Sequence, residues 1–467
     1  MSNPSTADPY KKKVSLTALP VELILQITSS LRTRDLSALR LTNTHLSTIV
    51  DPQFTKKAFS TLSTNLSTPS LHRLNQISTS RFAPAVTHLL INPNPSTFHN
   101  ALGYGTPWPR TQESWERNPK SGPATLARIL SNLPNCTAFS LKQIGLDFGV
   151  RGYTDLLPQP VWNAKKSERV VLSDVVALLL TLLQHEKRSV SSFELEAVHE
   201  GINKTGLTLI ASAFLIEGFA PAKYDFAIFG GLKELKVSYT LEHPLHGKFV
   251  AEILSHAPAL ENLLLNVRSA TARGGRALFS TIFAVDFKCP FSLRRFKLAG
   301  ARNNRHLVSR AGLARFILAQ RGTLRVLDLT TIRLMETGNA DADADADWDP
   351  VSGRHKGNEW VLFFSALKSA SFPALRRIHL AGLELQDGYP TLDENMEQDV
   401  PCHKHVVFLA EAEFVPLGMD VPLLRGGKET ACVRYDGCVE GVGAVLGMVC
   451  KCVVLRECEY VREAWMD

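Results

Sequence analysis

A short pattern of apolar residues recurs through the middle of the chain. A leucine is followed three residues later by an apolar residue, and two residues further on by another. Alternation of apolar and polar positions is typical of a β-strand with one buried face. Five copies lie at Leu232/Leu235/Val237, Leu260/Leu263/Leu265, Leu293/Phe296/Leu298, Leu324/Leu327/Leu329 and Leu375/Ile378/Leu380. Weaker copies lie at Val86/Leu89/Ile91 and at Phe193/Leu195.

Amphipathic helices are predicted between these strands. Apolar residues spaced as on one helix face occur over residues 172–183, 207–215, 313–317 and 360–367. Successive strand patterns begin 28, 33, 31 and 51 residues apart. A strand followed by a helix about every 30 residues resembles the leucine-rich repeat, whose units stack because none buries its apolar face alone. We therefore predict an α/β fold with an irregular leucine-rich-repeat-like solenoid.

A doubly wound α/β domain would show the same alternation of strands and helices. The five in-phase copies favour the solenoid. Leucine-rich repeats usually place asparagine or cysteine shortly after the strand, and this chain does not, so we expect an irregular stack. The residues at those positions are Thr240, Arg268, Ala301, Ile332 and Leu383. The longest gap contains an acidic insertion, residues 338–358, in which four aspartates alternate with alanine between Asp341 and Asp347.

The residues between the buried strand positions point to the opposite face of the sheet. In the five strands these are Glu234, Lys236, Asn262, Leu264, Arg295, Lys297, Val326, Asp328, Arg377 and His379. The later strands are mainly basic, which favours an acidic or phosphorylated partner segment. The candidate substrate-binding residues are Lys236, Arg295, Lys297, Arg377 and His379. An ordinary solvated face is the alternative.

Three short helices are predicted between Val14 and Ser60. Pro20 suits a first helical turn, Asp35 can cap a second helix, and a third helix follows Asn43. About 45 residues bury little surface, and the first helix is apolar over more than one face. This pattern indicates a unit that needs a partner. A helical cap packed on the rest of the chain is the alternative.

The same residues resemble the F-box motif in order and spacing. The matching positions are Leu19-Pro20-Val21-Glu22-Leu23-Ile24, Ile27, Leu31, Asp35-Leu36, Leu39-Arg40-Leu41 and Asp51-Pro52. F-box units bind a Skp-family adaptor and, through it, a cullin. The resemblance implies that the adaptor-binding residues are Leu19, Pro20, Leu23, Ile24, Ile27, Leu31, Leu36 and Leu39. The bulky aromatic residue often found in the third helix is absent, and Thr44-His45-Leu46 stands there.

The chain is accordingly divided into five parts. These are a disordered tail (1–13), the F-box (14–60), a connector with a proline- and glycine-rich loop (61–125), the solenoid (126–400) and a C-terminal capping segment (401–467).

Composition excludes several other classes of protein. The chain of 467 residues is 45% hydrophobic and 21% charged, as in soluble globular proteins. The net charge of +7 does not by itself require a nucleic acid partner. The polar N-terminus lacks the apolar segment of a signal peptide, and residues 170–183 are short for a membrane span. We expect a cytoplasmic or nuclear protein without a nucleic acid or membrane partner.

The sequence contains no standard catalytic or phosphate-binding motif. Eight cysteines are too few for a disulfide scaffold. Cys402, His403, His405, Cys432 and Cys438 could supply metal ligands, but their spacing matches no standard zinc site, and buried thiols are the simpler interpretation. We predict a non-catalytic substrate receptor of a ubiquitin ligase, without a cofactor. The alternatives are a cullin-independent scaffold and a metal- or thiol-dependent enzyme that uses these residues.

Overall fold

The computed structural model describes most of the N-terminal half of the chain and the strands and helices of the remainder. The described residues are 16–92, 106, 118–144, 172–198, 225–240, 244–268, 278–284, 286–300, 307–335, 348–349, 354–355, 359–381, 383–386, 403–409, 419–420, 429–430, 432–436, 446 and 453–457.

The N-terminal residues form a three-helix unit with its own small core. A turn of 3-10 helix, η1 (Leu16–Ala18), leads into α1 (Val21–Ser29), α2 (Thr33–Thr42) and α3 (Thr44–Phe59). The Asn43 side chain caps α3 by accepting hydrogen bonds from the backbone N–H groups of His45 and Leu46. The buried side chains are Ile24, Leu36, Leu46 and Val50, and they form a cluster separate from the main core. The three predicted helices are therefore present.

Nine parallel strands follow one another across a single sheet. They are β1 (Thr61–Thr64), β2 (His88–Ile91), β3 (Ala138–Ile144), β4 (Ser192–Val198), β5 (Glu234–Thr240), β6 (Asn262–Arg268), β7 (Arg295–Gly300), β9 (Val326–Thr330) and β13 (Arg377–Ala381). Each strand pairs in parallel with the next strand of this sheet along the chain. Two antiparallel strands, β18 (Cys432–Asp436) and β16 (Met419–Asp420), complete its C-terminal edge.

Hydrophobic burial explains the register of the sheet. Leu235, Leu263, Phe296, Leu327 and Ile378 are aligned on neighbouring strands, and all are buried. The next inward position, two residues later, is also apolar and buried in each strand. A slip of one residue would bring the polar positions into the core, so the apolar pattern specifies the pairing.

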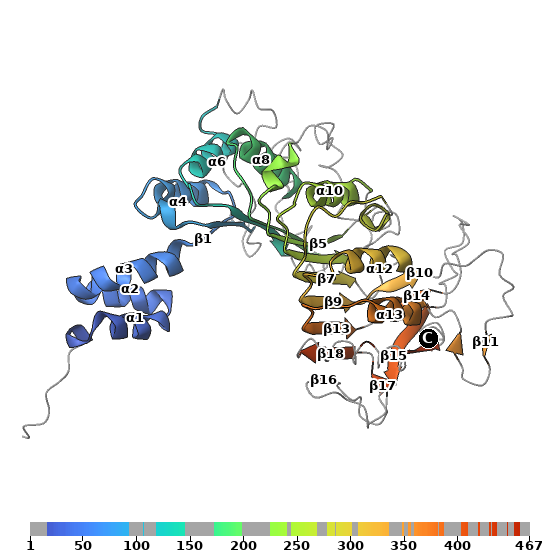
Figure 1. Cartoon of the computed structure of the whole chain (residues 1–467). Coiled ribbons are helices and arrows are strands. Elements are labelled where there is room, and N and C mark those ends of the chain that lie inside the picture. The colour runs from blue at the N-terminus through green and yellow to red at the C-terminus, as the bar shows by residue number, and fades with distance from the viewer. Residues whose placement is uncertain are drawn as a thin grey trace, which may run out of the picture.

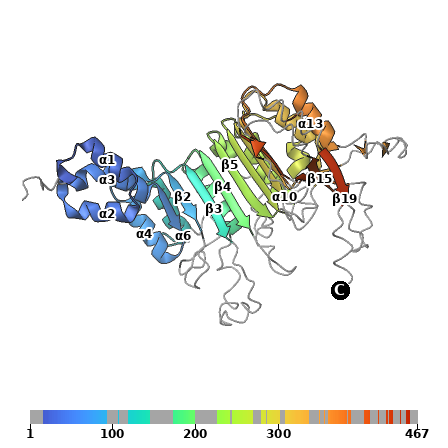
Figure 2. The same cartoon turned by 90° about the horizontal axis from the view of Figure 1, so that it is seen from below.

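Helices cover one face of this sheet, and the sheet curves so that they lie on its outer side (Figure 1). They are α4 (Thr68–Ser78), α6 (Gly122–Ser131), α8 (Leu172–His185), α10 (Pro244–Ser255), α12 (Arg310–Ala319) and α13 (Glu359–Ser369), with short turns η2 (Ala83–Ala85) and η7 (Phe226–Phe229). Figure 2 shows the opposite face, which no described helix covers. The helix predicted over residues 207–215 lies outside the described residues.

A second sheet forms beside the later strands of the first. Its three parallel strands are β8 (Leu307–Ser309), β10 (Arg333–Met335) and β14 (Glu384–Gln386), which follow β7, β9 and β13 along the chain. Antiparallel strands from the C-terminal segment extend it, namely β15 (His403–Leu409), β17 (Glu429–Thr430) and β19 (Val453–Glu457). Within the predicted acidic insertion, β11 (Trp348–Asp349) and β12 (Arg354–His355) pair with each other, and the rest of that insertion lies outside the described residues.

The fold is thus mixed α/β, built on a parallel sheet of nine strands. The sheet begins at Thr61, within residues 61–125, which the sequence pattern indicated as a connector. None of the described helices is long and apolar enough to cross a membrane.

Candidate functional site: an apolar helix face and an open sheet face

An apolar strip lies exposed on α1. Leu23 and Ile27 are each 45% exposed, and Pro20 beside them is also exposed. Residues four apart lie on one helix face, so Leu23 and Ile27 are neighbours. The packing of the unit explains why they stay exposed, since its core is filled by Ile24 from the adjacent side of the same helix. Of the five large hydrophobic side chains that are exposed among the described residues, four belong to this unit: Val21, Leu23, Ile27 and Leu41.

Polar contacts fix α1 against α3 behind this strip. The Gln53 side chain donates to the Leu25 carbonyl and lies 2.5 Å from the Thr28 hydroxyl. The Lys57 ammonium donates to the carbonyl of Ser29, the last residue of α1, and to that of Leu31 just after the helix. A cation at a helix C-terminus satisfies carbonyls that have no partner within the helix. The strip is therefore presented on a helix that is held at both its middle and its end.

The eight predicted adaptor-binding residues divide into three groups. Pro20, Leu23 and Ile27 are exposed, whereas Ile24 and Leu36 are fully buried in the core of the unit. The other three, Leu19, Leu31 and Leu39, are partly buried and pack against that core. Sequence reasoning did not include Leu41 among the exposed residues, although it is 87% exposed. Helical spacing could have indicated this, because Leu41 lies about 140° around α2 from the buried Leu36.

The three-helix unit joins the sheet through a single residue. Helix α3 ends at Phe59 and β1 begins at Thr61, so only Ser60 lies between them. The Ser60 carbonyl accepts hydrogen bonds from the backbone N–H groups of Thr87 and His88, and from the Thr87 hydroxyl. The joint is therefore held by the start of the second strand as well as by the chain itself.

Charged and aromatic contacts reinforce this joint. The Asp51 carboxylate pairs with Arg40 of α2 at 2.5 Å and with Arg81 of the sheet-bearing part at 3.3 Å. The Arg81 guanidinium also lies over the Phe82 ring, 4.8 Å from its centroid. Asp51 of α3 thus connects two helices to the body of the protein.

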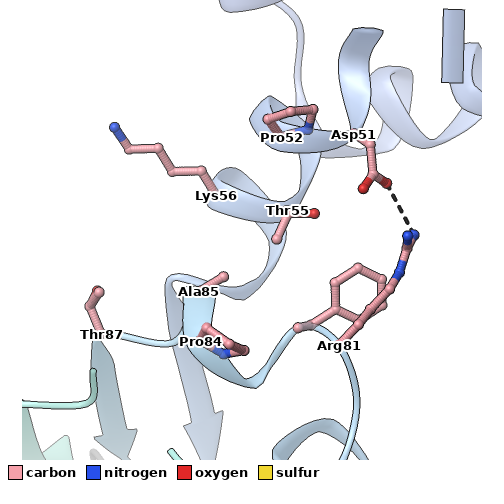
Figure 3. A pocket seen from close by; sticks show the side chains of 9 residues that line it. Asp51, Pro52, Thr55, Lys56, Arg81, Pro84, Ala85 and Thr87 are labelled. Atoms are coloured by element: carbon pink, nitrogen blue, oxygen red, sulfur yellow. Dashed lines mark hydrogen bonds and ion pairs between the residues drawn. The ribbon is translucent and has the colours of Figure 1, made fainter. Parts of the chain in front are cut away.

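A pocket of about 530 Å³ opens at the same joint (Figure 3). Its lining residues come from α3 and from the segment around η2: Asp51, Pro52, Thr55, Lys56, Arg81, Phe82, Pro84, Ala85 and Thr87. Figure 3 shows Arg81 directed at Asp51, while Lys56 points away from them. The Asp51 carboxylate in this lining is already engaged by Arg40 and Arg81, so it is not free to bind a ligand cation.

A polar network crosses the uncovered face of the sheet from β2 to β4. The Ser140 hydroxyl donates to Glu194 at 2.6 Å and lies 2.8 Å from the His88 ring nitrogen. Lys142 bridges Glu194 and Glu196 at 2.9 and 3.2 Å. Burial raises the pKa of Glu194, but hydrogen bonds from Ser140 and Lys142 outweigh it, and the net pKa is lowered. Burial lowers the pKa of Lys142, but the two glutamates reverse this and raise it.

Ion pairs also engage several of the predicted substrate-binding residues. Lys236 pairs with Glu234 at 3.0 Å on the same strand. The buried Asp328 lies between two of the predicted residues, with Lys297 at 3.1 Å and His379 at 3.1 Å. The structure therefore places these side chains on one face, as predicted. It also pairs Lys236 and Lys297 with carboxylates, which lowers the local positive charge, and places the His379 ring against Asp328.

Cys136 is buried within the fold, and Cys289 is partly buried. Burial raises the pKa of the Cys136 thiol to about 12 and that of Cys289 to about 11, so both are protonated at neutral pH. Over the described residues, no group of three His, Cys, Asp or Glu side chains could hold a metal ion. Of the candidate metal ligands, His403 and His405 lie on β15 and Cys432 lies on β18. Cys402 and Cys438 lie outside the described residues.

The chain was also compared with known proteins. No family model matches it, and no curated protein matches it.

Proposed function

We propose that this chain is the substrate-recognition subunit of a ubiquitin ligase of the Skp–cullin–F-box type. Its three-helix unit binds the adaptor, and its sheet-bearing part binds a protein substrate. The observation that supports the first part is the exposed strip of Pro20, Leu23 and Ile27 on a unit with its own core. Exposed apolar patches of this kind mark protein interaction sites.

The strand order supports the second part of the proposal. Nine strands pair in sequence order, and strand and helix alternate along one direction, as in a leucine-rich-repeat-like stack. Such stacks offer one continuous open face for a partner. The short joint at Ser60 holds the two parts together, so substrate bound on the sheet would keep a defined position relative to the adaptor.

The contribution to rate in this proposal is proximity. The chain supplies no reacting group of its own, and it raises the local concentration of substrate lysines near the ubiquitin-charged enzyme. The experiment therefore measures assembly with the adaptor.

The test is adaptor binding by the full-length protein with Leu23→Ser and Ile27→Ser combined. We expect this double variant to lose binding to a purified Skp-family adaptor in a pull-down, because both substitutions remove apolar surface from the exposed strip. Val21→Ser is the matched control, since Val21 is 43% exposed but lies on another side of α1. Unchanged binding by the double variant, with its fold intact by circular dichroism, would contradict the proposal. Recovery of a cullin with the wild-type protein separates a ligase subunit from a cullin-independent scaffold.

A further inference from the structure

A row of arginines lines the edge of the sheet where its later strands begin. Arg294, Arg325 and Arg376 directly precede β7, β9 and β13, and all three are exposed. The backbone N–H of Arg325 donates to the Arg294 carbonyl at 2.7 Å, and that of Arg376 donates to the Arg325 carbonyl at 2.9 Å. Since neighbouring strands lie about 4.8 Å apart, the three arginines span about 10 Å. Arg295 and Arg377, each one residue further on, add to the same edge.

Little negative charge balances this arginine edge. Arg294 pairs with Glu261 at 3.5 Å. Arg325 and Arg376 form no ion pair with another described residue. Asp328 lies two residues inside β9, but its carboxylate is already engaged by Lys297 and His379. Asp436 of β18 is the register partner of Arg377.

On the uncovered face of the sheet, in contrast, positive and negative side chains lie next to each other. There each described lysine alternates with an acid, as Lys142 does with Glu194 and Glu196, and Lys236 with Glu234. Like charges on directly adjacent strands destabilise a sheet, and arginine cannot relieve the repulsion by losing its proton. A row of adjacent arginines is therefore unfavourable in the free protein and becomes favourable when an anionic partner binds.

We propose that the arginine edge formed by Arg294, Arg325 and Arg376 binds an acidic segment of a protein partner, through several Asp or Glu carboxylates. Guanidinium groups grip carboxylates through paired hydrogen bonds. A row about 10 Å long is too long for one anionic group to contact all three arginines, whereas several successive carboxylates can contact them together. That this partner is a substrate rests on the proposed function. The inference places the recognition site at the residues that precede the strands, and not at the residues within them.

The test is fluorescence anisotropy on the full-length protein alone, with a labelled glutamate-rich peptide as the probe. We expect binding that weakens as salt rises, and a loss of about tenfold in affinity when Arg294, Arg325 and Arg376 are all replaced by serine. The matched control replaces Arg128, Lys248 and Arg315, which are exposed on α6, α10 and α12. It removes the same charge from the helical face and should bind like the wild type.

Three results would overturn the inference. The first is equal binding by the edge variant and the control variant. The second is tighter binding of a peptide whose only anionic group is one phosphoserine. The third is equally tight, equally arginine-dependent binding of a single-stranded oligonucleotide of the same charge. Because no adaptor is present, none of these results depends on the apolar strip of α1, and the Leu23→Ser/Ile27→Ser variant should bind the glutamate-rich peptide normally.

Discussion

Phe59 at the end of α3 stacks on Phe82 beside η2, with ring centroids 4.3 Å apart and ring planes 8° from parallel. The first ring ends the three-helix unit, and the second belongs to the part that bears the sheet. Phe54 meets Phe59 edge-on at 5.9 Å, so the contact continues into the unit. The two cores of the protein are thus connected by aromatic packing as well as by the chain.

Replacing Phe82 with alanine should loosen the joint while both parts remain folded. The change removes the stack on Phe59 and the ring beneath Arg81, a loss of about 2 kcal/mol in total. Limited proteolysis should then cut faster near Ser60, with little change in far-ultraviolet circular dichroism. Leu41→Ala serves as the control because that side chain is largely exposed. Proteolysis at the wild-type rate in Phe82→Ala would show that the stack does not hold the joint.

Ile24→Ala should destabilise the three-helix unit, whereas Leu23→Ala should not. Ile24 is fully buried in a core of four side chains, so its truncation should cost about 3 kcal/mol. The exposed Leu23 next to it should change stability by less than about 0.5 kcal/mol. Hydrogen–deuterium exchange of peptides from residues 21–59 measures both effects. Equal protection in the two variants would contradict the separate core.

The stability of the sheet should depend on pH through His88. Burial is the main cause that lowers the pKa of His88 below its ordinary value of 6.5. Below pH 6.5 the unfolded chain therefore binds a proton that the folded chain resists, and stability falls as the solution is acidified towards pH 5. His88→Gln removes that proton site. The difference in unfolding free energy between wild type and variant should change across this pH range, and a constant difference would contradict the assignment.

Gly312→Ala should destabilise the protein although it places a better helix former in α12. A Cβ atom there would lie 2.6 Å from the carbonyl oxygen of Phe283 and 2.7 Å from its Cβ. Backbone contacts this short force the two segments apart, which should cost about 2 kcal/mol and exceed the gain in helix propensity of about 1 kcal/mol. Gly322→Ala is the control, because a methyl group added there would meet no atom within 4 Å. Thermal unfolding of both variants measures the difference, and equal melting temperatures would refute the close packing.

The strands that the sequence predicted are those whose three inward positions are all large and apolar. Of the nine parallel strands of the main sheet, β1 and β3 were not predicted, because one inward position in each is unusual. In β3 the leading position is Cys136, which is buried like the leucines of the other copies. In β1 the last inward position is Thr64, whose hydroxyl accepts from the Leu66 N–H and contacts Ser70. A threonine satisfied by local hydrogen bonds replaces a leucine in the core, and no apolar pattern reveals it.

The sequence predicted which side chains share the uncovered face of the sheet, but it did not predict the acidic residues that pair with them. The alternation of side chains along a strand correctly assigned Lys236, Lys297 and His379 to one face. Their partners depend on which strands are neighbours, since His379 meets Asp328 across strands that lie 51 residues apart in the chain. The arginine row has the same origin, because Arg294, Arg325 and Arg376 become adjacent only through the sheet.

Because a single residue separates α3 from β1, the length of this joint determines the rotation of the three-helix unit relative to the sheet. Each added helical residue turns a helix by about 100° and advances it by only about 1.5 Å. One helical residue added at the end of α3 would therefore rotate the strip of Leu23 and Ile27 through more than a quarter turn about the axis of α3, with little movement along that axis. The number of residues in this joint therefore determines the direction of α1 relative to the sheet. Homologous chains that keep this direction are expected to keep the same number of residues there.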